Sequence, residues 1–183
     1  MEVIRSKPGL RNYYRNCPDQ IRGYFSELEG LLESSFSLDV ALAYAFAKVE
    51  QAHINCLYCG ITKLHQADKE LTWVALYKFH MTREGFREKY SVIYGKPIPK
   101  STIELLVFGE DVRDKVLHGK GGTPEEKRNA IAHVLEYARL LNDHCSGLNG
   151  PCPFGDLRGF KGRGTALKKG TTRWVLKGMG FGL

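Results

Sequence analysis

The sequence predicts an all-α protein, a bundle of four to five helices that ends in a glycine-rich, basic C-terminal tail. Along most of the first 142 residues, apolar side chains recur at three- and four-residue spacing, the period of an amphipathic helix. No stretch alternates apolar and polar residues between turn signals, as a strand would. Of the 183 residues, 43% are apolar and 26% are charged, a balance that is typical of folded globular proteins.

Two helices are predicted in the first third of the chain. Residues 20–34 place six apolar side chains at helical spacing. After them, Ser37 or Asp39 is the expected cap of a long second helix that continues through about residue 64. A short polar side chain at this position accepts a hydrogen bond from a free backbone N–H of the first turn.

A third helix is expected to begin after Asp68 and to restart at Thr82, because both residues are good caps. Gly95 ends the pattern. Aromatic residues at helical spacing within this stretch are expected to lie in the core rather than to form a base-stacking platform: Trp73, Tyr77, Phe79 and Phe86.

Two prolines in residues 96–100 predict a rigid turn before the fourth helix. Ser101 or Thr102 is the expected cap of that helix. Gly119 is its expected end, because glycine adopts the left-handed conformation that follows many helices.

Thr123 and Glu126 have the spacing of a capping box for a fifth helix. Pro124 would be its first residue, where a missing N–H leaves no hydrogen bond unmade. Beyond this helix, repeated glycine and proline break any long element. We therefore divide the chain into a helical domain, residues 1–149, and a basic tail, residues 150–183.

The net charge of +7 is concentrated in the tail. Residues 151–183 hold seven Lys and Arg residues against one acidic residue, Asp156. Cations of this kind neutralise phosphates, so RNA is the expected partner, and a solubilising tail is the alternative. The cations expected to contact RNA are Lys120, Arg158, Lys161, Arg163, Lys168, Lys169 and Arg173. Part of the tail is also expected to dock on the helices, through apolar residues such as Trp174, Leu176 and Phe181.

Cysteine usage leaves two interpretations open. Cys56 and Cys59 form a Cys-x-x-Cys pair that Cys145 and Cys152 would complete to four zinc ligands. The pair falls inside a helical pattern, however, and cysteine is often an ordinary buried residue. The N-terminus has no apolar signal segment, and no apolar run approaches the roughly 20 residues of a membrane span. A cytoplasmic protein without membrane association is expected.

The segment 113–119, Arg-Asp-Lys-Val-Leu-His-Gly, carries the most informative chemistry. Arg113 offers a planar fork of donors suited to phosphate, and His118 can exchange a proton near neutral pH. Asp114 is placed to orient either group. Five residues turn an ideal helix by about 500°, which leaves the two side chains about 140° apart. A distorted helix end, or a second copy of the chain, is needed to bring them together.

These residues resemble the signature of the HEPN superfamily: an arginine, usually a polar residue next, and a histidine a few positions later. Here four residues intervene between Arg113 and His118. The resemblance implies an all-α bundle, commonly dimeric, in which Arg113 and His118 of two protomers line one cleft. It also implies metal-independent endoribonuclease activity without a cofactor, in toxin–antitoxin, phage-defence or RNA-processing settings. An antitoxin or another protein partner would accompany such a role.

A second interpretation comes from another functional class. Many HEPN relatives are suspected of non-catalytic roles, and a chance Arg–His pair at this spacing is common. The chain would then be a catalytically inactive helical module that binds nucleotide or RNA, or that dimerises. Arg113 would pair with a nearby carboxylate, and His118 would bond a carbonyl at the helix end.

Overall fold

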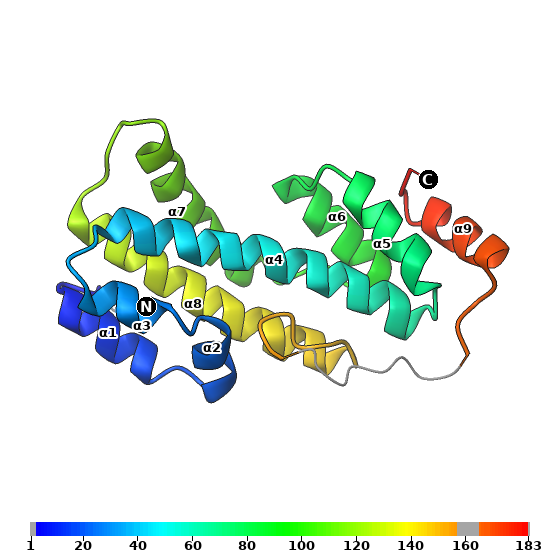
Figure 1. Cartoon of the computed structure of the whole chain (residues 1–183), viewed down its shortest axis with the longest axis horizontal. Helices are drawn as coiled ribbons and strands as arrows, with labels where there is room; N and C mark the ends of the chain where they lie inside the picture. The colour runs from blue at the N-terminus through cyan, green and yellow to red at the C-terminus, as the bar shows by residue number, and fades with distance from the viewer. Residues whose placement is uncertain (1–2, 157–164, 183) are drawn as a thin grey trace. The chain divides into compact units, whose positions relative to one another are not determined.

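The computed structural model describes residues 3–156 and 165–182, and regular structure in these ranges is helical throughout (Figure 1). The prediction of an all-α protein is confirmed. The described ranges contain nine helices, which in chain order are α1 (Lys7–Arg15), α2 (Asp19–Tyr24), α3 (Leu28–Glu33), α4 (Leu38–Leu64), α5 (Lys69–Lys78), α6 (Arg83–Tyr94), α7 (Lys100–Leu117), α8 (Pro124–Gly147) and α9 (Lys169–Gly178).

Several helix boundaries follow the local chemistry that predicted them. The side chain of Asp68 accepts a hydrogen bond from Leu71 N at 3.0 Å and caps α5. Thr82 caps α6 in the same way, accepting from Gly85 N at 3.0 Å. Gly95 ends α6 in the left-handed conformation, with φ of 70°. These predictions are confirmed.

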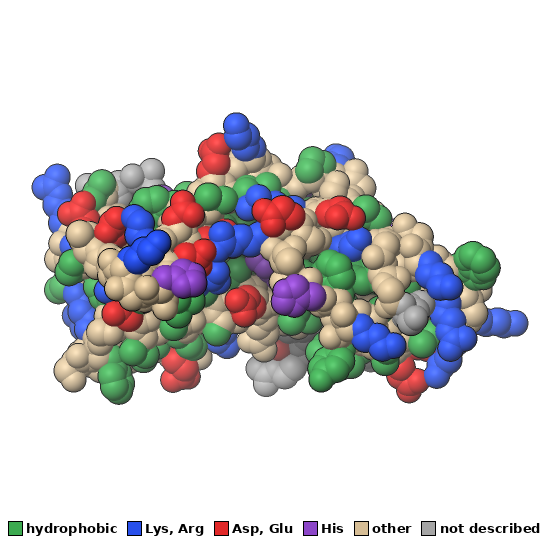
Figure 2. Space-filling view, turned by 90° about the horizontal axis from the view of Figure 1, so that it is seen from above, with side chains coloured by type: hydrophobic (Ala, Val, Ile, Leu, Met, Phe, Trp, Pro, Cys, Tyr) green, Lys and Arg blue, Asp and Glu red, His purple; other side chains and the backbone are tan. Residues whose placement is uncertain are grey.

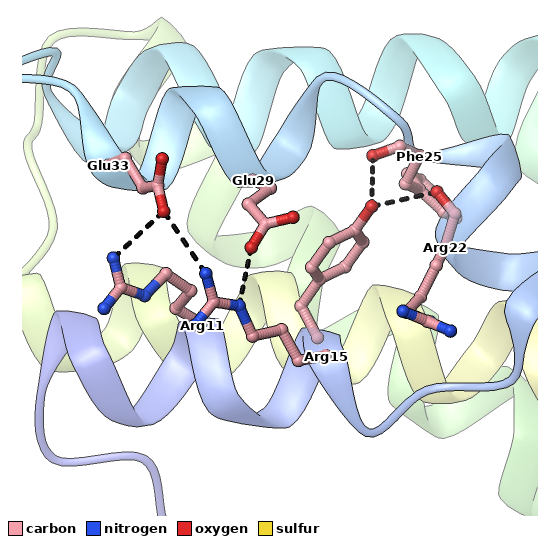
Figure 3. Close-up of polar contacts among 7 residues, drawn as sticks. Arg11, Arg15, Arg22, Phe25, Glu29 and Glu33 are labelled. Carbon is pink, nitrogen blue, oxygen red and sulfur yellow. Dashed lines mark hydrogen bonds and ion pairs between the residues drawn. The ribbon is translucent and has the colours of Figure 1, made fainter.

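The predicted helix over residues 20–34 is instead two short helices. Between α2 and α3 the backbone breaks near Phe25, which is fully buried. The break leaves helix-end carbonyls that need a donor. The hydroxyl of Tyr14 lies 2.9 Å from the carbonyl oxygen of Arg22 and 3.1 Å from that of Phe25, and it donates there (Figure 3).

Tyr14 belongs to α1, a helix that the apolar pattern did not predict, because only Leu10 and Tyr14 of its nine residues are buried. Ser6 caps α1 by accepting a hydrogen bond from Gly9 N at 3.1 Å. Ion pairs join α1 to α3, including Arg15 Nε to Glu29 Oε1 at 2.6 Å (Figure 3). These pairs are exposed, so each contributes at most about 1 kcal/mol to stability.

The predicted start of the fourth helix was wrong. The N-cap of α7 is Pro99, not Ser101 or Thr102, because helical geometry begins directly after the proline. Pro99 needs no side-chain cap hydrogen bond to start the helix, and Thr102 is buried within the first turn. Helix α8 ends at Gly147, the first glycine that follows the pattern of the predicted fifth helix.

The described residues form two compact units. The first contains residues 3–51, 99–142 and 154–156, and the second contains residues 52–98, 143–153 and 165–182. Helices α4 and α8 contribute residues to both. Within the described ranges, no helix combines the length and apolar character required to cross a bilayer.

An amide clamp organises the core of the first unit. Asn142 is buried and bonds both backbone groups of Phe154: its Nδ2 donates to Phe154 O at 3.0 Å, and its Oδ1 accepts from Phe154 N at 2.9 Å. The Phe154 ring stacks on Phe25 at 5.9 Å and meets the edges of Tyr24 and Tyr137. The clamp holds residues 154–156 against this aromatic core.

In the second unit, the C-terminal segment docks on α5. Helix α9 packs beside α5 (Figure 1), and Leu176 and Phe181 are buried. The edge of Phe181 meets Phe79 at 5.4 Å between ring centroids. The expectation that part of the tail docks is confirmed for Leu176 and Phe181. It was wrong for Trp174, which is exposed.

The expected aromatic core is also only partly present. Phe86 is buried, whereas Trp73 and Tyr77 are exposed. The buried residues of α5 are Thr72, Ala75 and Leu76, and a helix that presents this stripe to the core turns Trp73 and Tyr77 outward.

His53 couples the stability of the second unit to pH. Its ring is buried and stacks on Phe86, with centroids 3.7 Å apart. Burial, together with the nearby charge of Arg87, lowers the pKa of His53 from 6.5 to about 3. In the unfolded chain His53 takes up a proton as the pH falls through 6.5, and the folded chain does not. The free energy of unfolding therefore decreases as the pH falls from 6.5 toward 3.

We predict that His53→Gln flattens this acid dependence by up to about 1.4 kcal/mol per pH unit. Urea unfolding of both proteins between pH 4 and 7.5 measures the effect, with the exposed His80→Gln as the matched control. An unchanged pH slope in His53→Gln would show that His53 is not buried in its neutral form.

Candidate active site

Arg113 lies near the end of α7 and is held by three neighbours. Its Nε and Nη2 donate to Asp114 Oδ1 at 3.1 and 2.9 Å. Its Nη1 lies 3.6 Å from Glu50 Oε1, and its guanidinium carbon lies 4.9 Å from the centroid of the Phe46 ring. The side chain keeps 21% of its surface exposed. Arg113 is thus oriented in advance and still accessible to solvent.

Glu50 and Phe46 are partners of Arg113 that the sequence reasoning did not identify. Both lie on α4, four residues apart, a spacing that places them on one face of the helix. That spacing was a usable signal for a shared face. Which side chain of α7 would meet this face depends on the packing of two segments more than 50 residues apart in the sequence.

His118 is the C-cap of α7 and is exposed. The backbone around it forms a Schellman motif, in which Gly119 N donates to Val116 O at 3.1 Å and Lys120 N donates to Lys115 O at 2.9 Å. Gly119 has φ of 69°, as predicted for the residue that ends this helix. The motif satisfies the last carbonyls of α7 and fixes the backbone at His118.

The turn from α7 to α8 is closed by a second set of contacts. Glu126 Oε2 accepts from Thr123 N at 2.7 Å, and Thr123 Oγ1 accepts from Glu126 N at 3.1 Å, so the predicted capping box is confirmed. Lys115 Nζ reaches Glu126 Oε1 at 3.2 Å across the turn. The Thr123 backbone N–H and then Lys115 hold the pKa of Glu126 below its ordinary value. The carboxylate therefore remains ionised and keeps the turn closed at neutral pH.

The structure brings together only part of the predicted triad. Asp114 and Arg113 form a hydrogen-bonded pair. Among the residues that the structure describes, His118 makes no hydrogen bond or ion pair with either of them. Within one chain, the arrangement offers an oriented cation and an exposed proton-exchanging group at the same helix end, without direct contact between them.

The predicted RNA-binding cations fall into three groups. Lys120 is exposed in the turn after α7. Lys168, Lys169 and Arg173 are exposed at α9, and Lys169 Nζ pairs with Glu70 Oε2 at 2.8 Å. Figure 2 shows Lys and Arg side chains gathered over α9. The remaining three candidates, Arg158, Lys161 and Arg163, lie outside the described residues.

Three of the five cysteines, Cys56, Cys59 and Cys145, are buried thiols. Cys56 Sγ lies 3.9 Å from Cys145 Sγ, and Tyr90 Oη lies 3.3 Å from the latter. Burial raises the pKa of Cys59 to about 12 and also raises the pKa of Cys56, so these thiols stay protonated. In the described ranges, no three His, Cys, Asp or Glu side chains are grouped to hold a metal ion.

Comparisons of this chain with protein-family models, with curated proteins and with solved structures gave no match.

We predict that Gly119→Ala lowers the free energy of unfolding by about 1–2 kcal/mol, because a Cβ disfavours the left-handed backbone. An added Cβ at Gly119 would meet no atom within 4 Å, so the cost is conformational rather than steric. Gly23→Ala is the matched control: it also meets nothing within 4 Å, lies inside α2, and should stabilise the helix by about 0.5–1 kcal/mol. Equal effects of the two changes in urea unfolding would contradict the Schellman geometry.

Proposed function

We propose that this protein is a metal-independent endoribonuclease of the HEPN type that works as a homodimer. The observation that carries the proposal is that an exposed C-cap histidine, His118, and the oriented guanidinium of Arg113 occur at the same helix end. In this proposal, helices α4 to α8 correspond in their order to the four-to-five-helix bundle of the family. A toxin–antitoxin or phage-defence system is the setting we infer.

The proposed reaction uses the RNA's own 2′-hydroxyl as the nucleophile. In this proposal the neutral imidazole of His118 takes the proton of the 2′-hydroxyl as that oxygen attacks phosphorus, and it then returns the proton to the 5′-oxygen as the bond between phosphorus and that oxygen breaks. Arg113 binds the scissile phosphate and stabilises the charge that develops on it. Asp114 holds the guanidinium in position through its two hydrogen bonds. The products are a 2′,3′-cyclic phosphate and a 5′-hydroxyl.

A second chain completes the site in this proposal. Arg113 turns toward Phe46 and Glu50 of α4, whereas His118 projects from the end of α7. About 140° of helical rotation separates positions five residues apart, so one chain does not present both groups to one phosphate. A two-fold axis close to the α7–α8 turn would set Arg113 of one protomer opposite His118 of its partner.

The charge distribution supports RNA as the substrate. Six of the seven net positive charges belong to the C-terminal tail, where four exposed cations lie in residues 168–177. Phosphate neutralisation by such residues contributes affinity without sequence preference. RNA sequence and cleavage specificity would then come from other contacts.

One observation favours a second candidate, a catalytically inactive RNA-binding or dimerisation module. Arg113 is already paired with Asp114 and lies near Glu50, and these carboxylates compete with a phosphate for the guanidinium. The Glu50 contact at 3.6 Å is loose and Glu50 is well exposed, so a phosphate can displace it at small cost. A nuclease assay separates the two candidates.

We predict that the purified protein cleaves single-stranded RNA in the presence of EDTA. His118→Ala should reduce the single-turnover rate at saturating RNA by about 10²–10⁴-fold, the usual contribution of general acid–base catalysis. Arg5→Ala, which removes an exposed side chain of the first unit that belongs to neither proposed site, should retain the wild-type rate. Cleavage that persists in both His118→Ala and Arg113→Ala would exclude this site.

A mixing experiment tests whether two chains build one site. Arg113→Ala and His118→Ala are each expected to be inactive, but a heterodimer of the two contains one intact pair, formed by Arg113 of one chain and His118 of the other. An equimolar, exchanged mixture should recover about a quarter of the wild-type activity, because half of the dimers are mixed and each has one working site. Failure to recover activity in a mixture proven to exchange subunits would contradict the composite site.

A further inference from the structure

Helices α5 and α9 form a continuous surface in the second unit, because they pack side by side in parallel (Figure 1). Near their starts, Asp68 N donates to Thr172 Oγ1 at 3.0 Å. Beyond their ends, Phe79 meets Phe181 at 5.4 Å. Because the helices touch near both ends, the first turns of α5 and α9 lie next to each other, and so do their last turns.

Large aromatic side chains project from this surface into solvent. Trp73, Tyr77 and Trp174 are 53%, 85% and 77% exposed. Trp73 and Tyr77 are four residues apart on α5 and share its outer face. Trp73 is braced by an edge contact with Tyr58 at 5.9 Å. Exposed apolar groups that gather on one surface are typical of binding sites.

Cations follow the aromatic side chains. Lys169, Arg173 and Lys177 occur at four-residue intervals along one side of α9. Lys169 pairs with Glu70 of α5. Glu70 lies one turn before Trp73 and Val74 on the outer face of α5. The cationic side of α9 therefore begins beside the aromatic side of α5. Residues 165–182 contain four Lys and Arg residues and no Asp or Glu. Glu70 pairs with one of these four cations, so α9 still presents a net positive charge beside exposed rings.

A hollow adjoins this surface at the C-terminal end of α5. It is lined by Lys78, Phe79, His80 and Gly182 and has a volume of about 470 Å³. Lys78 follows Tyr77 directly in the sequence, so the hollow adds one aromatic side chain, Phe79, and one lysine next to the exposed ring.

We propose that this α5–α9 surface, defined by Trp73, Tyr77, Arg173, Trp174 and Lys177, binds single-stranded RNA. Bases stack on the rings while the cations of α9 contact phosphates. The choice of RNA rests on the proposed nuclease function, and the surface supplies a substrate-holding site separate from Arg113 and His118. Unpaired bases are required, because a duplex keeps its base faces stacked and inaccessible to aromatic side chains.

The mixture of rings and cations favours RNA over a protein partner. The buried centre of a protein–protein interface is depleted of charged residues, and lysine is disfavoured there. Here Lys177 lies one turn from Trp174 on the same helix, so a protein partner that covered the ring would also have to cover a lysine. A polyanion with aromatic bases satisfies both kinds of group at once.

The test is fluorescence anisotropy with a labelled 2′-O-methyl oligouridine of about 12 nucleotides, which the proposed mechanism does not cleave. Tyr77→Ala and Trp174→Ala should each weaken binding by about 5- to 150-fold, the range measured when a stacking ring is removed. Tyr77→Phe, which keeps a ring, should bind like wild type. Phe36→Ala, which removes an exposed ring from the first unit, is the matched control and should also bind like wild type.

Two further readouts make the outcome decisive. Lys177→Ala should flatten the slope of log affinity against log salt by about 0.7 if it contacts one phosphate of a single strand. His118→Ala should bind the uncleavable RNA as tightly as wild type, because His118 lies outside the α5–α9 surface. The binding assay therefore tests this surface alone, and the cleavage assay tests the nuclease proposal. Wild-type binding by folded Tyr77→Ala and Trp174→Ala, checked by circular dichroism, would overturn the proposal. So would loss of self-association in these variants without any change in RNA affinity.

Discussion

The candidate site depends on one constraint, the closure of the turn between α7 and α8. Gly119 supplies the left-handed residue that a side chain with a Cβ disfavours, and the Schellman bonds then end α7 at His118. On the far side of the turn, Thr123 and Glu126 satisfy each other's backbone N–H groups and begin α8. The backbone position of His118 is therefore a consequence of main-chain hydrogen bonding at the helix end.

Parts of the fold that depend on local chemistry were predictable from the sequence. The caps at Asp68, Thr82 and Thr123, and the glycine at residue 119, act within one helical turn, so their residue types are sufficient signals. The break between α2 and α3 was not predictable, because the carbonyls it exposes are satisfied by Tyr14 of another helix. Helix α9 was missed for a similar reason: its glycine-rich, cationic sequence is weakly helical, and burial of Leu176 against α5 stabilises it.

The same distinction applies to the site. The residue types and spacing of Arg113 and His118 were visible in the sequence, and the sequence also placed His118 at a helix end. The partners that orient Arg113 come from α4, and only tertiary packing brings Phe46 and Glu50 to it. For Trp73 and Tyr77 the sequence led to a wrong prediction, that these side chains lie in the core. Their spacing is helical, but spacing alone does not say which stripe of the helix faces the core.

The central claim is that the RNA's own 2′-hydroxyl attacks the phosphate under the control of Arg113 and His118. A DNA oligonucleotide that contains one ribonucleotide, incubated with the protein in EDTA, tests this most directly. The account predicts a single cut on the 3′ side of that ribonucleotide, with a 2′,3′-cyclic phosphate identified by mass spectrometry and lost in His118→Ala. Cleavage of the all-DNA oligonucleotide, or products that end in a 3′-hydroxyl, would contradict it.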